Sequence, residues 1–380
     1  MSVEGEIVVR VAWDGQRVRD ARVASSRPFA ASRVLEGLTP SEAVQRLPRL
    51  FSICGNAQSA ACSRALTGAG ATVEGAMLAA DVALETVQEY FWRLLIDWPH
   101  TMHRDVDAAG VADVRRAIAS QTGEPGAARR NGGTEALRDL AATLRTIAEQ
   151  KIYGIPPAEW LTLSDDGALT AWIERAATLP AQLLGLLLDT MPSLGRSDVA
   201  LMPPPRREAL LDAVVPAMVR RAQFAAAPTW HGEPVETGAL ARMRSQPLVA
   251  SLLARHGNSV AVRMAARLAE LATLLAGLDS RSVRDPGALA ESVPLADGEG
   301  LGAVQTARGL LLHRARVADG RITRYQIVAP TEWNFHPEGA LARGLRGVIA
   351  QDCATLEQKT RLAVQGLDPC VAFRIEIRDA

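Results

Sequence analysis

The chain has 380 residues, 48% of them apolar, so it is long enough and apolar enough to fold as a globular protein with a sizeable core. Its 42 basic and 42 acidic residues cancel to a net charge of zero. This balance removes the usual electrostatic reason to expect nucleic acid or an anionic membrane as a partner.

Cysteine usage and the N-terminus bear on where the protein works. Four cysteines in a chain of this length do not form a disulfide framework, so we expect free thiols in a reducing cytoplasm. The start, Met1–Glu4, has no basic and apolar leader, which predicts no signal peptide. The longest apolar stretch, near 183–188, is too short to span a bilayer. These features predict a cytoplasmic protein with no membrane partner.

Residues 5–24 predict a β-hairpin at the start of the chain. Glu6–Ala12 is rich in β-branched residues, and Asp14-Gly15 supplies a favoured two-residue turn before the chain returns. A helical body is expected to follow over residues 39–280.

This body should begin at Thr39, the first residue of a Thr-Pro-Ser-Glu capping box with proline at the first helical position. Residues 121–133 contain Gly, Pro and two adjacent Arg, and predict an exposed loop. Apolar residues at spacings of three and four predict an amphipathic helix over 137–147. Further helices are expected near 59–100, 170–189, 206–224 and 259–277.

A second hairpin is expected over 309–328, where two β-rich runs flank Asp319-Gly320. A helix near 352–366 then leads to a short C-terminal motif at 366–376. The elements together predict a mainly α fold with small antiparallel β-hairpins, in the α+β class.

Two cysteines near opposite ends of the chain occupy short, unusual motifs. Cys54 lies in Ile-Cys-Gly and Cys370 in Asp-Pro-Cys. Three residues after each cysteine stand Ala57 and Phe373, neither of which can ligate a metal. Half of two Cys-x-x-Cys clamps is therefore present, as in a metal-site scaffold whose catalytic half has been removed.

The segment 307–337 reads ARGLLLHRARVADGRITRYQIVAPTEWNFHP. It strongly resembles the part of nickel-iron hydrogenase large subunits with an Arg-Gly…His…Gly-x-Ile-x-x-Tyr-Gln…Pro-Thr-x-Trp-Asn pattern. Glu236–Arg242, which reads ETGALAR, and the two cysteine motifs resemble other stretches of that family in the same order. The resemblance implies that residues 1–380 form a single domain with a shortened large-subunit-like helical fold.

The departures from that family concern the metal ligands. In the enzymes the first cysteine of each pair is a terminal nickel ligand and the second bridges nickel and iron. Here the bridging positions are Ala57 and Phe373, and Glu376 stands where a histidine follows the last motif. This pattern is similar to the HupK/HoxV family of hydrogenase maturation proteins.

That resemblance implies a non-catalytic scaffold that carries an iron unit, Fe(CN)₂(CO), transiently and without nickel. The partners implied are a HypC/HypD-type complex and the hydrogenase large-subunit precursor. Cys54 and Cys370 would be the iron ligands, and Arg308 and Thr331 would support the cyanide ligands. Glu4 matches a proton-gating residue of the enzymes and would be a hydrogen-bonding residue near the site.

Other interpretations stay open from the residues alone. Cys62 and Cys353 match no ligand position and are expected to be small core residues, although Cys62 follows Cys54 by eight positions and could be a substitute ligand. His313 is expected to be structural, with its nitrogens satisfied by local hydrogen bonds. Two other functions remain: a metal-free structural subunit of a larger redox complex, and a metalloenzyme with an atypical site, which the missing bridging cysteines disfavour.

Overall fold

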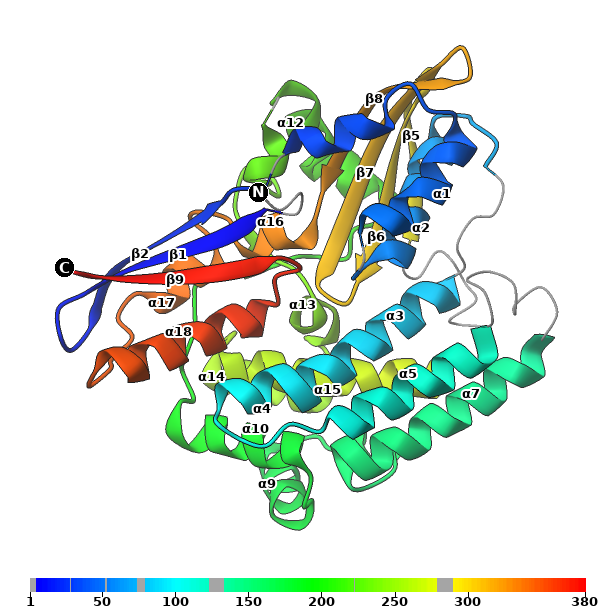
Figure 1. The fold of residues 1–380 in the computed structure, drawn as a ribbon. Helices are drawn as coiled ribbons and strands as arrows, with labels where there is room; N and C mark the ends of the chain where they lie inside the picture. The colour runs from blue at the N-terminus through cyan, green and yellow to red at the C-terminus, as the bar shows by residue number, and fades with distance from the viewer. Residues whose placement is uncertain are drawn as a thin grey trace.

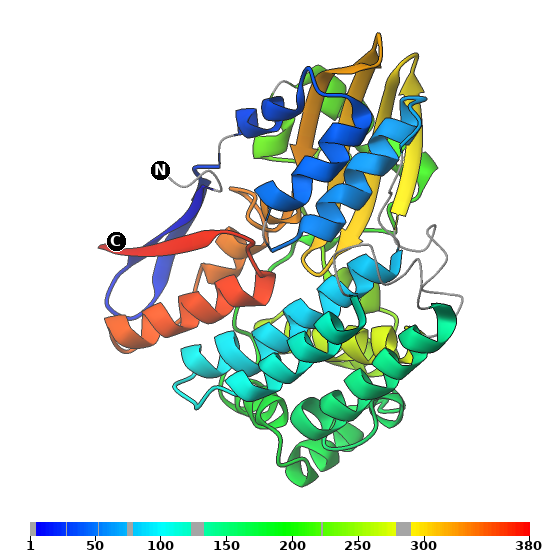
Figure 2. The same cartoon turned by 45° about the vertical axis from the view of Figure 1, so that its right-hand side comes forward.

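A computed structural model of the chain describes residues 5–27, 29–51, 53–73, 79–122, 133–221, 223–278 and 290–380. Glu4 and most of the predicted loop at 121–133 lie outside these ranges. Figures 1 and 2 show three parts: a four-stranded sheet with helices on both faces, a group of long helices beside it, and a three-stranded sheet that carries both chain ends.

Helices make up most of the described chain. Their bounds are α1 (Pro40–Leu50), α2 (Gly55–Gly68), α3 (Ala79–Trp92), α4 (Trp98–Thr101), α5 (Ala108–Thr122), α7 (Gly133–Ala148), α8 (Pro157–Trp160), α9 (Asp166–Arg175), α10 (Leu179–Thr190), α11 (Arg207–Ala213), α12 (Val215–Arg220), α13 (Ala239–Met243), α14 (Pro247–His256), α15 (Val260–Gly277), α16 (Pro330–Asn334), α17 (Ala340–Leu345) and α18 (Cys353–Leu367). The strands are β1 (Glu6–Trp13), β2 (Val18–Ser25), β3 (Ala200–Leu201), β4 (Val235–Glu236), β5 (Ala290–Ala296), β6 (Glu299–Thr306), β7 (Gly309–Ala318), β8 (Arg321–Val328) and β9 (Ala372–Asp379).

Local signals account for the elements that the sequence predicted. The hairpins β1–β2 and β7–β8 form where the Asp-Gly turns place them. The capping box at the start of α1 is present, because the Thr39 side chain accepts from the Glu42 N–H and the Glu42 carboxylate accepts from the Thr39 N–H. Because helices make up most of the described chain, the mainly helical prediction is confirmed. No helix within the described ranges is both long and apolar enough to cross a membrane.

The three-stranded sheet has the order β2-β1-β9 and was only partly predicted. β9 lies parallel to β1, with Ile7 paired to Phe373, so this sheet is not a simple antiparallel hairpin. The C-terminal motif at 366–376 therefore runs into a strand that closes against the first strand of the chain. This pairing holds the turn that contains Cys370 beside the N-terminal hairpin (Figure 1).

The second sheet has four antiparallel strands in the order β5-β6-β7-β8, of which only β7 and β8 were predicted. α1 and α2 lie on one of its faces (Figure 2), with α2 directly against β6. Small residues permit the close approach: a Cβ on Gly302 would overlap the carbonyl oxygen of Ala61, and one on Gly300 would overlap that of Ala65. The sheet thus fixes the position of α2 and of Cys54 at its N-terminal end.

Replacing Gly302 by alanine is expected to lift α2 away from the sheet. Overpacking of this kind costs about 1–3 kcal/mol, so the free energy of unfolding in a urea titration should fall by that amount. Gly167→Ala is the control, because this exposed glycine lies in the first turn of α9 and alanine is the better helix former there. Equal stability of Gly302→Ala and the wild type would contradict the close packing described above.

Buried ion pairs hold the long helix α15 in place. Arg263 donates from Nε and Nη2 to the carboxylate of Glu236, at 2.8 Å for each bond, and both side chains are almost completely buried. Arg242 donates to Glu270 at 2.8 Å, and the Tyr90 hydroxyl donates to the same carboxylate at 2.6 Å. These pairs join α3, β4, α13 and α15, and Tyr90 and Arg242 also contact the carbonyls of Ala307 and Thr306, next to Arg308.

Candidate metal centre

The fold brings the two motif cysteines together. Cys54 is the N-cap residue of α2, and Cys370 lies in the turn between α18 and β9. Both views place the N-terminal end of α2 close to that turn (Figures 1 and 2). Cys54 and Cys370 lie close enough for a negative charge on Cys370 to act on Cys54, and a charge on either sulfur would act on Arg27 and on Arg308. Two thiols separated by 316 positions in the sequence therefore belong to one half-buried site.

Cys370 is surrounded by hydrogen-bond donors. Arg27 donates from Nη2 to the Cys370 sulfur at 2.9 Å. The Cys370 N–H donates to the Thr331 hydroxyl oxygen at 3.2 Å, and this hydroxyl lies 3.1 Å from the sulfur, to which it can donate when the sulfur is a thiolate. Arg27 also pairs with the buried carboxylate of Glu332 at 3.3 Å. A guanidinium and a hydroxyl thus lie within hydrogen-bond distance of this sulfur, an arrangement that suits a thiolate ligand.

Cys54 has a different environment. The Gln58 side-chain amide donates to its sulfur at 3.7 Å. Burial, followed by the charges of Cys370 and Glu85, raises the pKa of the Cys54 thiol to about 12. Glu85 accepts from the N–H groups of Asn56 and Ala57 at 2.8 and 3.2 Å, and burial raises its own pKa to about 7. Without a metal, the Cys54 sulfur therefore carries its proton at neutral pH.

The raised pKa predicts slow alkylation of Cys54, because the thiolate is the nucleophile. At pH 8, iodoacetamide should label Cys54 at least about 100-fold more slowly than a free cysteine of ordinary pKa. The exposed Cys353 provides the internal comparison, and peptide mass spectrometry follows both sites in one sample. Equal labelling rates at Cys54 and Cys353 would contradict the environment described for Cys54.

Arg308 lies beside the thiols within a buried charge network. Its Nη2 donates to Glu89 at 2.6 Å, and its Nε lies 3.5 Å from Asp368. Asp368 in turn lies 2.7 Å from Arg93 Nε. Burial lowers the pKa of Arg308, but the charges of Asp368 and Glu89, to which any charge on the two sulfurs would add, outweigh burial and leave this pKa above its usual value. Arg308 therefore keeps a fixed positive charge next to both sulfurs.

Ala57 and Phe373 stand at the positions that resemble the bridging cysteines of the enzymes. Neither side chain has a donor atom, and both pack within the fold. Ala57 is completely buried against the sheet, and its N–H donates to Glu85. Phe373 lies in β9, with its ring 5.4 Å from the Arg361 guanidinium. Among the described residues, no three His, Cys, Asp or Glu side chains gather as a metal-binding group. The candidate site thus contains the two thiols of Cys54 and Cys370.

The remaining predicted residues have mixed outcomes. Cys62 is completely buried in an apolar cluster and shares a hydrogen bond with the Tyr325 hydroxyl, as expected for a core residue. The prediction that Cys353 is a core residue is wrong, because this side chain is exposed at the first turn of α18. Glu4 lies outside the described residues. His313 is buried between two hydrogen-bond partners, in agreement with its structural interpretation.

Three residues of the site were missed. Gln58 could have been found from its spacing, since residues four apart on a helix are neighbours and it follows Cys54 by four positions. Arg27 and Glu85 carry no local signal: each reaches the site only through the fold, Arg27 from the segment after β2 and Glu85 from α3.

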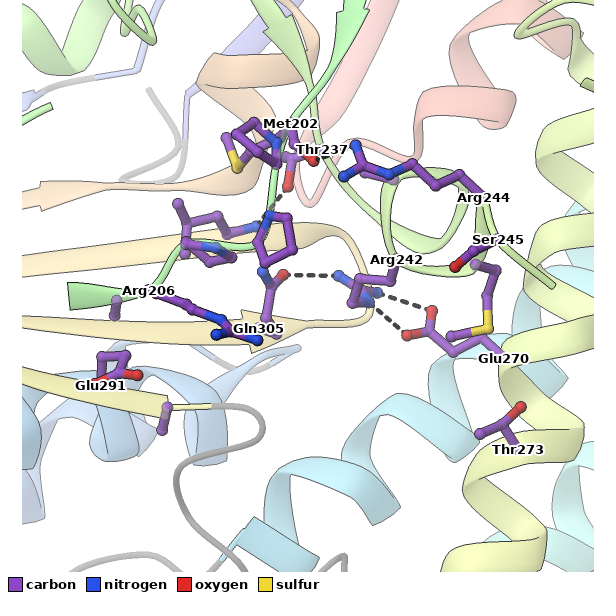
Figure 3. Close-up of a pocket in the computed structure, with 18 of the residues that line it drawn as sticks. Met202, Arg206, Thr237, Arg242, Arg244, Ser245, Glu270, Thr273, Glu291 and Gln305 are labelled. Carbon is purple, nitrogen blue, oxygen red and sulfur yellow. Dashed lines mark hydrogen bonds and ion pairs between the residues drawn. The ribbon is translucent and has the colours of Figure 1, made fainter. Parts of the chain in front are cut away.

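A cavity of about 500 Å³ lies elsewhere, between β6 and the helices α13 and α15. Figure 3 shows Arg242 in its wall, donating to Glu270 and to Gln305. Neither Cys54 nor Cys370 lines this cavity. It is therefore separate from the thiol site, and Arg242 in its wall is already paired with Glu270.

Comparison with known proteins finds a matching family model and several similar proteins. A family model described as nickel-dependent hydrogenase matches residues 246–375. The hydrogenase expression/formation protein HupK of Rhizobium leguminosarum is 33% identical, over 94% of this chain and 92% of the relative. The corresponding HupV protein of Azotobacter chroococcum is 32% identical, over 98% of each chain.

The chain belongs to the HupK/HoxV family of hydrogenase expression/formation proteins. A further HupK/HoxV member, HoxV of Cupriavidus necator, is 29% identical over 94% of this chain and 93% of its own length. Among solved structures, a [NiFeSe] hydrogenase variant from Desulfovibrio vulgaris Hildenborough has 18% identity and a TM-score of 0.55, and the match covers 97% of this chain and 99% of that one. This HupK/HoxV chain therefore has the fold of nickel-iron hydrogenase large subunits, as the sequence predicted.

Proposed function

We propose that this HupK/HoxV protein acts in hydrogenase maturation as a non-catalytic scaffold. Its cargo would be an iron unit with two cyanides and one carbon monoxide, Fe(CN)₂(CO), which it would pass to a hydrogenase large-subunit precursor. The observation that carries the proposal is the meeting of Cys54 and Cys370 in one polar, half-buried site whose bridging positions are Ala57 and Phe373.

The charges around the thiols suit this cargo. Iron(II) with two cyanides is neutral, so coordination by two thiolates gives the assembly two negative charges. Arg27 and Arg308 place two guanidinium groups beside the sulfurs and offset that charge. Cyanide nitrogens accept hydrogen bonds, and guanidinium N–H groups are suitable donors for them.

The number of donors suits transient carriage. Two thiolates can hold an iron that brings its own strong-field ligands, while further coordination positions stay open. A site that binds through two sulfurs also releases its cargo more readily than one that binds through four. Because neither Ala57 nor Phe373 has a donor atom to bridge a second metal, the site should take no nickel and perform no hydrogen chemistry.

Affinity purification from a hydrogenase-producing cell under anaerobic conditions separates this function from its main rival. The scaffold should co-purify with a HypC/HypD-type complex and with the large-subunit precursor, in amounts that fall once maturation is complete. A metal-free structural subunit would instead co-purify in fixed stoichiometry with electron-transfer subunits, and that result would contradict the proposal.

A further inference from the structure

One face of α2 carries Cys54, Gln58 and Cys62 at successive spacings of four. Residues four apart on a helix lie one above the other, so these three side chains form a single stripe. The stripe faces the four-stranded sheet, where His313 of β7 and Tyr325 of β8 contact it.

The five side chains are joined by hydrogen bonds. Gln58 donates from Nε2 to the Cys54 sulfur at 3.7 Å, and its Oε1 lies 2.8 Å from His313 Nε2. His313 Nδ1 lies 2.7 Å from the Tyr325 hydroxyl, and this hydroxyl shares a hydrogen bond with Cys62. The chain of contacts thus runs from a completely buried thiol in the core to the thiol of the site.

The donor at each link is determined by its partner. The Gln58 oxygen can only accept, so His313 Nε2 must carry a hydrogen. Burial lowers the pKa of His313 to about 3, so the ring is neutral and Nδ1 must accept from the Tyr325 O–H. Cys62 then donates its S–H to the Tyr325 oxygen. Every donor points toward Cys54, an arrangement in which successive hydrogen bonds strengthen one another.

We propose that Gln58 is a positioning residue for the iron ligand Cys54, and that His313 and Tyr325 hold its amide with the N–H group directed at the sulfur. The description of Cys54 as an iron ligand rests on the proposed function. The contact between Gln58 and Cys54, however, is present in the protein without iron. A glutamine free to rotate could equally present its oxygen to the sulfur, which would repel a thiolate. That rotation would also require the His313 hydrogen to move from Nε2 to Nδ1 and the Tyr325 O–H to turn from His313 toward Cys62, so the contacts beyond Gln58 favour the orientation described here.

The two sulfurs consequently receive hydrogen bonds of unequal strength. Cys370 receives a guanidinium at 2.9 Å and a hydroxyl at 3.1 Å, whereas Cys54 receives one neutral amide at 3.7 Å. Strong donors to a thiolate withdraw electron density from it. Cys54 is therefore the more electron-donating of the two iron ligands, and Gln58 adjusts that difference.

The test compares Gln58→Leu and Tyr325→Phe with Ser59→Ala in the full-length protein. Ser59 is the matched control: its hydroxyl donates to the Val44 carbonyl at 3.1 Å, so the change also removes one buried hydrogen bond of α2 without touching Cys54. In iron-free protein, iodoacetamide labelling of Cys54 should slow about three- to tenfold in Gln58→Leu, the effect of one lost hydrogen bond. Tyr325→Phe should slow it by less, and Ser59→Ala should leave it unchanged.

A second measurement uses the iron-loaded protein. Loss of the Gln58 bond makes the Cys54 sulfur more electron-donating, so the carbon monoxide band in the infrared spectrum should move to lower wavenumber in Gln58→Leu but not in Ser59→Ala. Unchanged labelling in both Gln58→Leu and Tyr325→Phe would overturn the positioning role. Absence of iron bands in the wild type as well would overturn the proposed function instead, and the labelling result would still decide the role of Gln58.

Discussion

Replacing Cys370 by alanine is expected to abolish iron carriage and, with it, the maturation of hydrogenase in the cell. Removal of outer-shell partners alone typically costs about 10- to 100-fold in metal affinity, so loss of one of two ligands should cost at least about 100-fold. Cys54→Ala should have the same effect, because a single thiolate leaves the iron without its second anchor. Hydrogenase activity of a deletion strain complemented with each variant measures the result.

The control for this pair is Cys353→Ala. Cys353 is also a free thiol but is exposed at the first turn of α18, away from the hydrogen bonds of the site. Complementation by this variant should equal that of the wild type. Full hydrogenase activity with both Cys54→Ala and Cys370→Ala would favour a metal-free structural subunit.

Replacing Asp368 by asparagine should cause the largest loss of stability. Asp368 is 2% exposed, with Arg93 at 2.7 Å and Arg308 at 3.5 Å. Removal of one partner from a buried ion pair costs about 3–5 kcal/mol, because the remaining charges stay buried without compensation. Asparagine tolerates the left-handed backbone at this position, where φ is 56°, so the change tests the charge alone. Urea unfolding measures the difference.

The pH dependence of this contribution follows from the sign of the pKa shift. Burial raises the pKa of Asp368, but Arg93, Arg308 and Arg267 outweigh burial and hold it below its usual value of 3.8. Its stabilising contribution is therefore present above pH 3.8 and is lost as the pH falls through the lowered pKa. Above pH 5 the Asp368→Asn deficit should be constant, and it should shrink in stronger acid.

Asp198→Asn is the matched control for Asp368→Asn. Asp198 also pairs with an arginine, Arg343, at 3.1 Å, but its side chain is 78% exposed. Solvent screens such a pair, so the free energy of unfolding should hardly change. A small effect of Asp368→Asn, equal to that of Asp198→Asn, would contradict the role given to the buried network.

Elements with a local signal were predictable from the sequence. The turn at Asp319-Gly320 and the capping box at Thr39 each act within a few residues, so both gave the correct element. β6 gave no such signal, because Gly300 and Gly302 lower its strand propensity. Those glycines are needed for contact with α2, a partner more than 200 residues earlier in the chain.

Only the site residues that lie in recognisable sequence motifs could be predicted. Cys54, Cys370, Arg308 and Thr331 come from segments that resemble a known family, and the fold brings them to one place. Arg27 approaches Cys370 because β9 pairs with β1, a parallel contact between the two ends of the chain that no local pattern indicates. Its guanidinium is nevertheless the donor at 2.9 Å from the sulfur.

Infrared spectroscopy of the protein, purified without oxygen from a hydrogenase-producing cell, tests iron carriage most directly. Carbon monoxide and cyanide bound to iron absorb in a region of the infrared spectrum where proteins are nearly transparent, so their bands directly indicate a bound iron unit. We expect one carbonyl band and two cyanide bands, together with iron and no nickel by elemental analysis. A spectrum without those bands, from protein that contains no iron, would contradict the account.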